Sequence, residues 1–371
     1  MITELRLHNF KCFNDIKIGF SQINLFAGMN GRGKSTILQA MLLLSQSIRS
    51  DGSIDSISIN GKFVSLGNLS DIIAIQSGTR KIGIGVSVDD EMDKDLDIFS
   101  DEDYDGSSWL SLGSVISNGK ELVQMMSGFP SSGEDNKEVK KSLGVTSDLA
   151  PLQELRNVYF VSADRRGPIN DVPIEKVNGN IGIHGENVLN VLNSYREIIP
   201  KVQEVLQEVL SEGFIYVEED SENRVRLFLD SHNGSSGFKP VNVGFGYSYI
   251  LSIIVTVLMA RNEAKIFIEN PEAHLHPYAQ SHIMDFIVRE AKKKNLQLFI
   301  ETHSEHVLDG LRRNLVQINA TDDALIYFFG KEHFEKIMID SVGNLSDFPT
   351  DFFDQMQQDL REISSYSRKR R

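Results

Sequence analysis

The sequence predicts an α/β protein in which helices cover a parallel sheet and antiparallel strands lie beside it. Two observations predict this class. Near the N-terminus, an apolar run at residues 23–27 leads into a glycine-rich loop and then into a helical pattern at residues 36–48. From Gly244 onward, helical and strand patterns alternate, which is the order of a parallel sheet with helical crossovers.

Composition is that of a globular protein with enough apolar material for a large core. The 371 residues are 40% hydrophobic and 24% charged, a length that allows two domains or one large domain with insertions. A net charge of -14 argues against a surface coated in basic residues for nucleic acid. The single cysteine, Cys12, excludes an intrachain disulfide, and we expect it to be buried.

Targeting signals are not visible in the sequence. The N-terminus lacks a charged segment followed by an apolar one, and the longest apolar stretch, residues 250–260, is shorter than the roughly 20 residues that span a bilayer. We therefore expect a cytoplasmic protein without membrane contact.

The first lobe, residues 1–88, begins with alternating strands around Leu5 and Leu7 and again at residues 16–20. The apolar strand, glycine loop and helix follow. Asn60 and Gly61 then stand between two alternating runs, a strong hairpin signal, and alternation resumes at residues 82–88. These patterns predict an antiparallel β subdomain beside the main sheet.

The middle of the chain is predicted to hold two insertions. Residues 89–150 form the first, because ten carboxylates and one lysine between Asp89 and Asp105 favour a solvated, mobile loop. A fragment at residues 101–106 resembles half of a calcium loop, but Leu112 occupies the position that requires Glu, so calcium is not predicted.

Residues 151–240 form the second insertion, of helical and β character. It carries a helical pattern at residues 188–210 with a break near Pro200, and a hairpin at residues 215–229 with its turn at residues 220–223. The second lobe, residues 241–371, contains a helix to Met259, strands at 265–268 and 297–300, and a helix at 279–294 between these strands.

A complete phosphate-binding motif, G-x-x-x-x-G-K-[ST], is present at residues 28–35 (GMNGRGKS). Glycines let such a loop point its backbone N–H groups at phosphates, and the helix that follows favours negative charge. Lys34 is predicted to bridge the β- and γ-phosphates, Ser35 to bind Mg²⁺, and Thr36 to reach the α-phosphate. The predicted nucleotide ligands are Gly28, Asn30, Gly31, Arg32, Gly33, Lys34, Ser35 and Thr36.

Two apolar strands that end in polar residues complete the chemistry. The first, KIFIENPE at residues 265–272, ends in Glu269, which is predicted to hold Mg²⁺ at the carboxyl edge of a parallel sheet. The second, LFIETHS at residues 298–304, places His303 where it could contact the γ-phosphate and the attacking water. His274 and His276 have zinc-like spacing, but no further ligands stand near them.

A fourth segment, VGFGYS at residues 243–248, precedes an apolar helix. A turn of small residues at a helix start can present N–H groups and a hydroxyl to phosphate. Gly244, Gly246 and Ser248 are therefore predicted nucleotide contacts, although an ordinary helix start would have the same appearance.

These motifs together resemble the ABC-type ATPases of the OLD, RecF and SMC branch. The resemblance rests on NFKCF at residues 9–13, ENPEAHLHP at 269–277 and ETHS at 301–304. FPTDFFDQ at residues 348–355 is similar to a bacterial subgroup with a C-terminal domain of unknown function. The resemblance covers residues 1–75 and 155–355.

The resemblance implies a P-loop NTPase of ABC-ATPase head type over residues 1–371. Such a head has a mixed central sheet with helices on both faces, an antiparallel β subdomain and a helical insertion. ATP and Mg²⁺ are the implied cofactors. ATP would lie between the glycine loop of one subunit and residues 244–248 of another, in a homodimer or a higher oligomer. His303 would be the switch histidine, and residues 274–276 would contact the partner subunit.

Asn270 departs from the family pattern, which has a Glu there to orient water. Asparagine cannot act as a general base, so slow hydrolysis is expected unless Glu272 or His303 positions the water. Glu269, Asn270, Glu272 and His303 are thus the candidate catalytic residues. Gln76 is the candidate for the family's glutamine at the phosphate and metal.

Arg165 and Arg166 resemble an arginine-containing stretch of the same family, and they either touch nucleotide or a partner or pair with acids. The basic C-terminus, residues 368–371, leaves DNA contact open. A switch or sensor subunit that controls a separate nuclease or toxin in anti-phage defence, as in Septu- and PARIS-like systems, is the first hypothesis. A DNA-repair ATPase of RecF type that clamps DNA is the alternative, and a scaffold that binds ATP without turnover is the third.

Overall fold

The computed structural model describes residues 1–75, 78–89, 94–100, 109–124, 149–211, 213–230, 237–331 and 333–369. The chain forms two compact units. Unit 1 comprises Met1–Ser21 and Ser35–Val158, and unit 2 comprises Gln22–Lys34 and Tyr159–Arg371. Gln76 and the calcium-like fragment at residues 101–106 lie outside the described residues.

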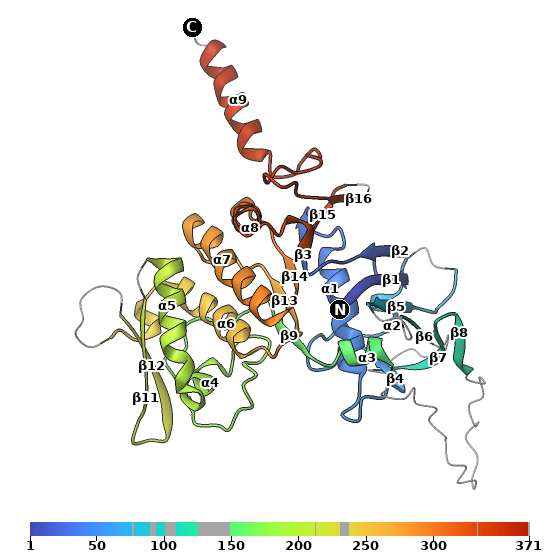
Figure 1. The fold of residues 1–371 in the computed structure, drawn as a ribbon, viewed down its shortest axis with the longest axis horizontal. Helices are drawn as coiled ribbons and strands as arrows, with labels where there is room; N and C mark the ends of the chain where they lie inside the picture. The colour runs from blue at the N-terminus through green and yellow to red at the C-terminus, as the bar shows by residue number, and fades with distance from the viewer. Residues whose placement is uncertain are drawn as a thin grey trace. The chain divides into compact units, whose positions relative to one another are not determined.

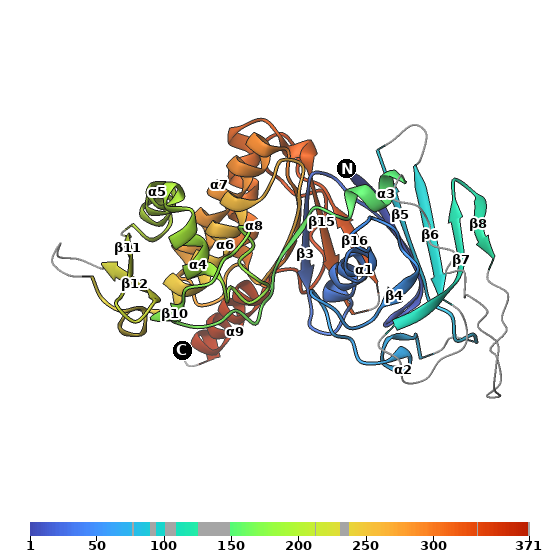
Figure 2. The same ribbon diagram turned by 90° about the horizontal axis from the view of Figure 1, so that it is seen from below.

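Unit 1 contains an antiparallel sheet in the order β2-β1-β5-β6-β7-β4, with β8 paired to β7 (Figure 2). Its strands are β1 (Ile2–Phe10), β2 (Phe13–Gly19), β4 (Ser56–Ser58), β5 (Gly83–Val88), β6 (Asp95–Ser100), β7 (Trp109–Ser117) and β8 (Lys120–Gln124). Its helices are α1 (Lys34–Ser47), α2 (Leu69–Ile72) and α3 (Ala150–Glu154). The alternating pattern predicted for the first lobe therefore does produce antiparallel strands, and β1 and β2 belong to the same sheet.

Strand β6 corrects the prediction of a mobile acidic loop at its described residues. Leu96 and Ile98 are buried, and the acids alternate with them toward the other face. Asp97 accepts a hydrogen bond from Arg6 Nε at 2.7 Å, so its charge is paired on the neighbouring sheet surface. Apolar residues alternate with acids in this segment, a pattern that is typical of a half-buried strand. The prediction of a loop gave weight to the number of acids and not to their alternation with apolar residues.

The Asn60 hairpin is displaced from its predicted position. Asn60 pairs with Ser65, and the Gly61 N–H donates to the Val64 carbonyl at 2.9 Å, so residues 62 and 63 occupy the turn. Asn60 is not one of the two central turn residues. Its Oδ1 atom accepts hydrogen bonds from the Gly67 N–H and the Ser65 hydroxyl. The preceding strand β4 pairs with β7, which is distant in sequence.

Unit 2 contains a six-stranded sheet in the order β16-β15-β3-β14-β13-β9 (Figure 1). The strands β13, β14, β3 and β15 are mutually parallel, and β16 is antiparallel to β15. The strands are β3 (Ile23–Gly28), β9 (Val158–Val161), β13 (Lys265–Glu269), β14 (Gln297–Glu301), β15 (Ala324–Phe329) and β16 (Phe334–Ile337). Strand β9 falls inside the segment predicted as an insertion but belongs to this main sheet.

One hydrophobic core joins the sheet to its helices α6 (Phe245–Met259), α7 (Pro277–Lys294) and α8 (Glu305–Gln317). Leu25, Ile268 and Ile300 contribute from neighbouring strands. The strand residues that alternate with these point to the other face of the sheet. There the ring centroids of Phe267 and Phe299 lie 4.7 Å apart. The α/β prediction for the second half is correct in element order.

Sequence signals explain where α7 and α8 begin and end. Pro277 occupies the first turn of α7, and Asn295 closes the helix in the left-handed conformation. Three lysines in the last turn of α7 complement the helix dipole. Ser304 caps α8 by accepting hydrogen bonds from the N–H groups of His306 and Val307.

A small sheet, β10-β12-β11, packs with two helices in the same unit. Its elements are β10 (Asp171–Pro173), α4 (Val188–Ser194), α5 (Ile199–Leu210), β11 (Phe214–Glu219) and β12 (Arg224–Asp230), with 3₁₀ turns at Arg196–Ile198, Pro240–Asn242 and Thr321–Asp323. The predicted hairpin is present with its turn in place. The predicted helix break near Pro200 is also present, between α4 and α5, and Pro200 lies in the first turn of α5, where its missing N–H costs nothing.

The C-terminal helix α9 (Gln355–Lys369) follows a segment that is anchored in the core. Phe352 is fully buried and packs edge-on against Phe328, with ring centroids 5.1 Å apart. Beyond this anchor, apolar side chains recur at helical spacing and are more than half exposed: Met356, Leu360, Ile363 and Tyr366.

Two further expectations can be compared with the structure. Cys12 is exposed, not buried, because it lies in the turn between β1 and β2. Within the described ranges, none of the helices combines the length and apolar character needed to cross a membrane.

Candidate functional site

The phosphate-binding loop begins where β3 ends. Gly28, Gly31 and Gly33 all have positive φ, at 124°, 72° and 104°, conformations that favour glycine. Gly28 lies against Phe329 of β15, so that a Cβ on Gly28 would be 2.4 Å from the Phe329 carbonyl oxygen. The Met29 N–H donates to that same oxygen at 3.0 Å. The adjacent strand thus fixes the start of the loop.

The Lys34 side chain folds back on the loop and binds its backbone. This side chain is buried, and Nζ donates to the carbonyl oxygens of Gly28 at 3.0 Å and Met29 at 2.7 Å. Burial lowers the pKa of Lys34, and the nearby Glu301 carboxylate opposes that shift. Ser35 and Thr36 follow directly as the first turn of α1, while Asn30 and Arg32 are exposed.

Glu269 ends β13 at the carboxyl edge of the parallel strands, as predicted from its place in the apolar run. Its Oε2 accepts a hydrogen bond from the Ala163 N–H at 2.9 Å. Burial raises the pKa of Glu269, and the Ala163 N–H, Arg165 and Ser162 partly offset the rise. A carboxylate whose ionised form is costly in the apo protein is well suited to gain a cation.

Glu301 is a residue that the sequence interpretation did not assign. It ends β14, lies in register opposite Glu269, is buried and is close enough to Lys34 to affect its pKa. The signal that could have found it is its position at the end of the strand next to Glu269 in a parallel sheet. The edge therefore carries two carboxylates and one ammonium group.

Asn270 follows Glu269 in the left-handed conformation, with φ of 46°. Asparagine tolerates this conformation better than most residues. Its N–H donates to the Glu301 carbonyl at 2.8 Å, and its own carbonyl accepts from Arg165. Its Oδ1 atom is buried and makes no hydrogen bond to the described residues.

Glu272 lies in the turn after Asn270 and is held from β14. Its Oε2 accepts from the Thr302 hydroxyl and its Oε1 from the His303 N–H, both at 2.7 Å. Thr302 is fully buried, and its hydroxyl also accepts from the Ser304 N–H at 3.0 Å. Hydrogen bonds therefore link the Glu272 carboxylate to the His303 backbone.

His303 points toward the loop. Burial and the Lys34 ammonium lower its pKa, whereas Glu272 and a hydrogen bond to the Gly28 backbone oppose the change. Its imidazole is thus favoured in the neutral form, in which one ring nitrogen can accept a proton.

The segment at residues 244–248 begins α6 on the far side of the Glu272 turn. Gly244 is the N-cap and has open space at its Cα, whereas a Cβ on Gly246 would be 2.8 Å from the His274 carbonyl oxygen. Ser248 is half-buried, and its carbonyl accepts from Ser252. The His274 ring lies near that of Phe245, with centroids 5.6 Å apart.

The residues at the sheet edge suit a nucleotide with Mg²⁺. The loop has the glycine conformations and the lysine of a phosphate cradle, and Mg²⁺ in such sites takes one or two carboxylates together with phosphate oxygens. Within unit 2, Glu269 is the residue that would hold the metal. Among the described residues, no cluster of three His, Cys, Asp or Glu side chains forms a self-sufficient metal site.

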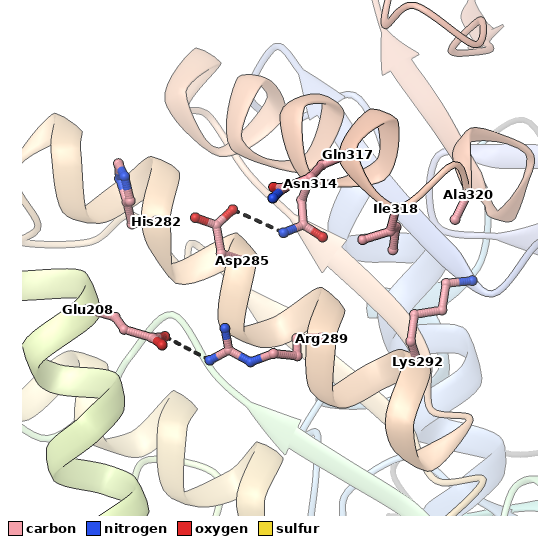
Figure 3. Close-up of a pocket in the computed structure, with 9 residues that line it drawn as sticks. All are labelled: Glu208, His282, Asp285, Arg289, Lys292, Asn314, Gln317, Ile318 and Ala320. Atoms are coloured by element: carbon pink, nitrogen blue, oxygen red, sulfur yellow. Dashed lines mark hydrogen bonds and ion pairs between the residues drawn. The ribbon is translucent and has the colours of Figure 1, made fainter.

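A groove along α7 is separate from these motifs (Figure 3). It is lined by Glu208, His282, Asp285, Arg289, Lys292, Asn314, Gln317, Ile318 and Ala320. Arg289 pairs with Glu208 at 2.7 Å within the groove, and Asp285 and Lys292 pair with Arg313 and Asp323, which lie outside its lining. It offers no uncompensated charge for phosphate.

Comparison with known families decides the relationship. Residues 23–309 match the family described as "AAA domain, putative AbiEii toxin, Type IV TA system". The chain belongs to this AAA family. Residues 320–363 match "Protein of unknown function (DUF3696)". The predicted membership of a family of AAA-type ATPases is confirmed.

Individual relatives agree with this assignment. This AAA protein is 21% identical over 377 residues to the OLD nuclease of Thermus scotoductus, in an alignment covering 93% of the chain and 67% of that relative. An SMC head bound to the C-winged-helix domain of ScpA is 14% identical, covers 96% of this chain and 99% of its own, and has a TM-score of 0.52.

An SMC head with an extended coiled coil, from Pyrococcus furiosus, gives 13% identity, 98% and 99% coverage and a TM-score of 0.51. It was solved bound to the C-terminal domain of ScpA. At this identity the likeness concerns the fold alone, and it confirms the ABC-ATPase head class.

Proposed function

We propose that this AAA protein is an ATP-gated switch that controls a separate effector, a nuclease or a toxin, in prokaryotic anti-phage defence. It binds ATP with Mg²⁺, hydrolyses it slowly and pairs two heads while ATP is bound. The family's toxin–antitoxin description and the nuclease relative support this context.

The observation that carries the proposal is the state of Glu272. With Asn270 unable to act as a base, Glu272 in the turn that follows is the candidate to replace the usual glutamate. Both of its oxygens already accept hydrogen bonds from Thr302 and His303. Because both oxygens are engaged by these donors, the carboxylate is oriented toward Thr302 and His303 rather than toward a water, which favours a long-lived ATP state.

The remaining residues have complementary roles in this proposal. Lys34 leaves the loop carbonyls to neutralise phosphate charge, and Glu269 with Ser35 holds the metal. When bound, Mg²⁺ neutralises the charge that develops on the phosphate oxygens. His303, neutral and near Lys34, orients the water and senses the γ-phosphate. Gly244, Gly246 and Ser248 present N–H and hydroxyl groups to the nucleotide of the partner head.

The first test measures the mass of the purified chain by light scattering, with and without ATP and Mg²⁺. We expect the mass to double with ATP in the wild type but not in Lys34→Ala, and Lys336→Ala, an exposed lysine on β16, to behave as wild type. Phosphate release is expected to be slow relative to nucleotide exchange. A wild-type chain that stays monomeric with ATP overturns the proposal.

The second test concerns the effector. Native-host purification should recover a nuclease or toxin with the wild type, in an ATP-dependent manner, and the pair should reduce phage plating unless Lys34 is changed. A chain that elutes alone in every nucleotide state, with no effect on plating, contradicts the switch role. ATP-dependent retention on duplex DNA that weakens with salt would instead support a DNA clamp of RecF type.

A further inference from the structure

A short segment after β9, residues 162–166, is fastened on two sides, and we call it the strap. On one side, the Ser162 N–H donates to the Ile183 carbonyl at 2.9 Å and the Arg166 N–H to the His184 carbonyl at 2.8 Å. On the other side, the Ala163 N–H donates to Glu269 Oε2. The strap therefore has a fixed backbone next to the predicted metal carboxylate.

Arg165 projects from the strap into the interior and is only 2% exposed. Its Nη1 donates to the Glu269 carbonyl at 3.0 Å and its Nη2 to the Asn270 carbonyl. Its guanidinium lies 5.3 Å from the centre of the Tyr249 ring, which belongs to the first turns of α6. One side chain thus contacts the end of β13, the turn beyond it and the start of α6.

The cost of this arrangement indicates a role beyond packing. Burial lowers the pKa of Arg165 to about 10 despite the opposing effects of Glu272, Tyr249 and Glu269. The Nε atom is buried and makes no hydrogen bond to the described residues. A buried donor without a partner lowers the free energy of unfolding. An apolar side chain of similar size at this position would therefore give a more stable fold.

We propose that Arg165 is a positioning residue for the ATPase reaction. It holds the Glu269 and Asn270 carbonyls and the Tyr249 ring together, and so keeps the metal carboxylate and the start of α6 in one arrangement. This inference rests on the proposed role of Glu269 as a Mg²⁺ ligand.

Loss of the guanidinium is expected to lower the affinity for Mg²⁺ and to leave the metal-free affinity for ATP unchanged. Mg²⁺ requires near-ideal geometry, and loss of a residue that orients a metal ligand typically lowers metal affinity by about 10–100-fold. Without Mg²⁺, nucleotide affinity depends on the glycine loop and Lys34, which Arg165 does not contact. The expected signature is therefore a raised Mg²⁺ half-saturation with an unchanged metal-free ATP affinity.

The experiment titrates Mg²⁺ at fixed fluorescent ATP in Arg165→Met, which keeps most of the aliphatic stem. Arg261→Met, an exposed arginine after α6, is the matched control and should behave as wild type. Glu269→Gln separates the two hypotheses. If Glu269→Gln leaves the Mg²⁺ half-saturation unchanged, the metal assignment of the proposed function fails. If Glu269→Gln raises it and Arg165→Met does not, only the role of Arg165 is wrong.

Arg165→Lys provides a readout that a purely structural role would not move. Lysine keeps a cation at this position but has a single ammonium group in place of the two guanidinium nitrogens that contact the Glu269 and Asn270 carbonyls. Its Mg²⁺ half-saturation should therefore fall between those of wild type and Arg165→Met, with the metal-free ATP affinity unchanged. An Arg165→Lys half-saturation no closer to wild type than that of Arg165→Met overturns the inference.

Discussion

The contact between Gly28 and β15 leads to the sharpest stability prediction. Gly28 has φ of 124°, and a Cβ there would be 2.4 Å from the oxygen and 2.7 Å from the nitrogen of Phe329. Both are backbone atoms of a paired strand, so they cannot rotate away. Gly31 in the same loop has φ of 72° and no atom within 4 Å of an added Cβ. Alanine at Gly28 should suffer both a steric clash and an unfavourable backbone conformation, whereas alanine at Gly31 should suffer only the latter. Comparing the two variants therefore separates the two energetic costs.

The two costs can be estimated from this geometry. An unfavourable backbone conformation costs about 1–3 kcal/mol and forced overpacking another 1–3 kcal/mol or so, which gives on the order of 4 kcal/mol for Gly28→Ala. Gly31→Ala has only the left-handed conformation to accommodate, at about 1–2 kcal/mol. For a unit of this size each kcal/mol lowers Tm by about 2–4 °C, so Gly28→Ala should lower it by roughly 10 °C.

Urea unfolding and thermal scans of the nucleotide-free protein measure this difference. Gly28→Ala should lose far more stability than Gly31→Ala, while both weaken ATP binding because both lie in the phosphate loop. If the two variants lose equal stability, or if Gly28→Ala melts with the wild type, the close packing of the loop on Phe329 is wrong.

Three further predictions concern the sheet edge. Thr302→Val should cost about 1–3 kcal/mol in urea unfolding, because half-buried Glu272 loses the donor of buried Thr302, whereas Thr302→Ser keeps the hydroxyl; equal losses would contradict that bond. The pKa of His303 is lowered, so the unfolded chain binds a proton that the folded one resists; stability should fall below about pH 6.5 and recover above it, less so in His303→Gln, and an identical pH dependence would refute this. Burial raises the pKa of Glu269, so Glu269→Gln should raise Tm near about pH 7 without Mg²⁺, and a lower Tm would show that the ionised carboxylate is not costly.

The motifs at the sheet edge could be placed from sequence because each depends on local order. An apolar run that ends in a polar residue predicts a buried strand and the residue at its end, as for Glu269 and His303. The helix break near Pro200 could also be placed, because proline is favoured in the first turn of a helix.

Other features depend on contacts that no local pattern carries. The packing of Phe329 on Gly28 joins residues 301 positions apart (329 minus 28), and Arg165, which follows β9, contacts Glu269 at the end of the neighbouring strand β13, 104 positions away. The pairing of β4 with β7 likewise replaced a local hairpin with a distant partner. Where several local choices have similar stability, tertiary packing selects among them.

Strand β15 lies in a segment that is matched separately from the AAA domain. The segment matched as a protein of unknown function begins at residue 320 and so includes β15, whose Phe329 carbonyl receives the Met29 N–H, and the buried Phe352. Part of this segment packs directly on the start of the phosphate loop and so contributes to the structure around it. Exchanging this segment between relatives should therefore change nucleotide affinity, and sequence variation at residues 28–29 and 328–329 is expected to be inherited together.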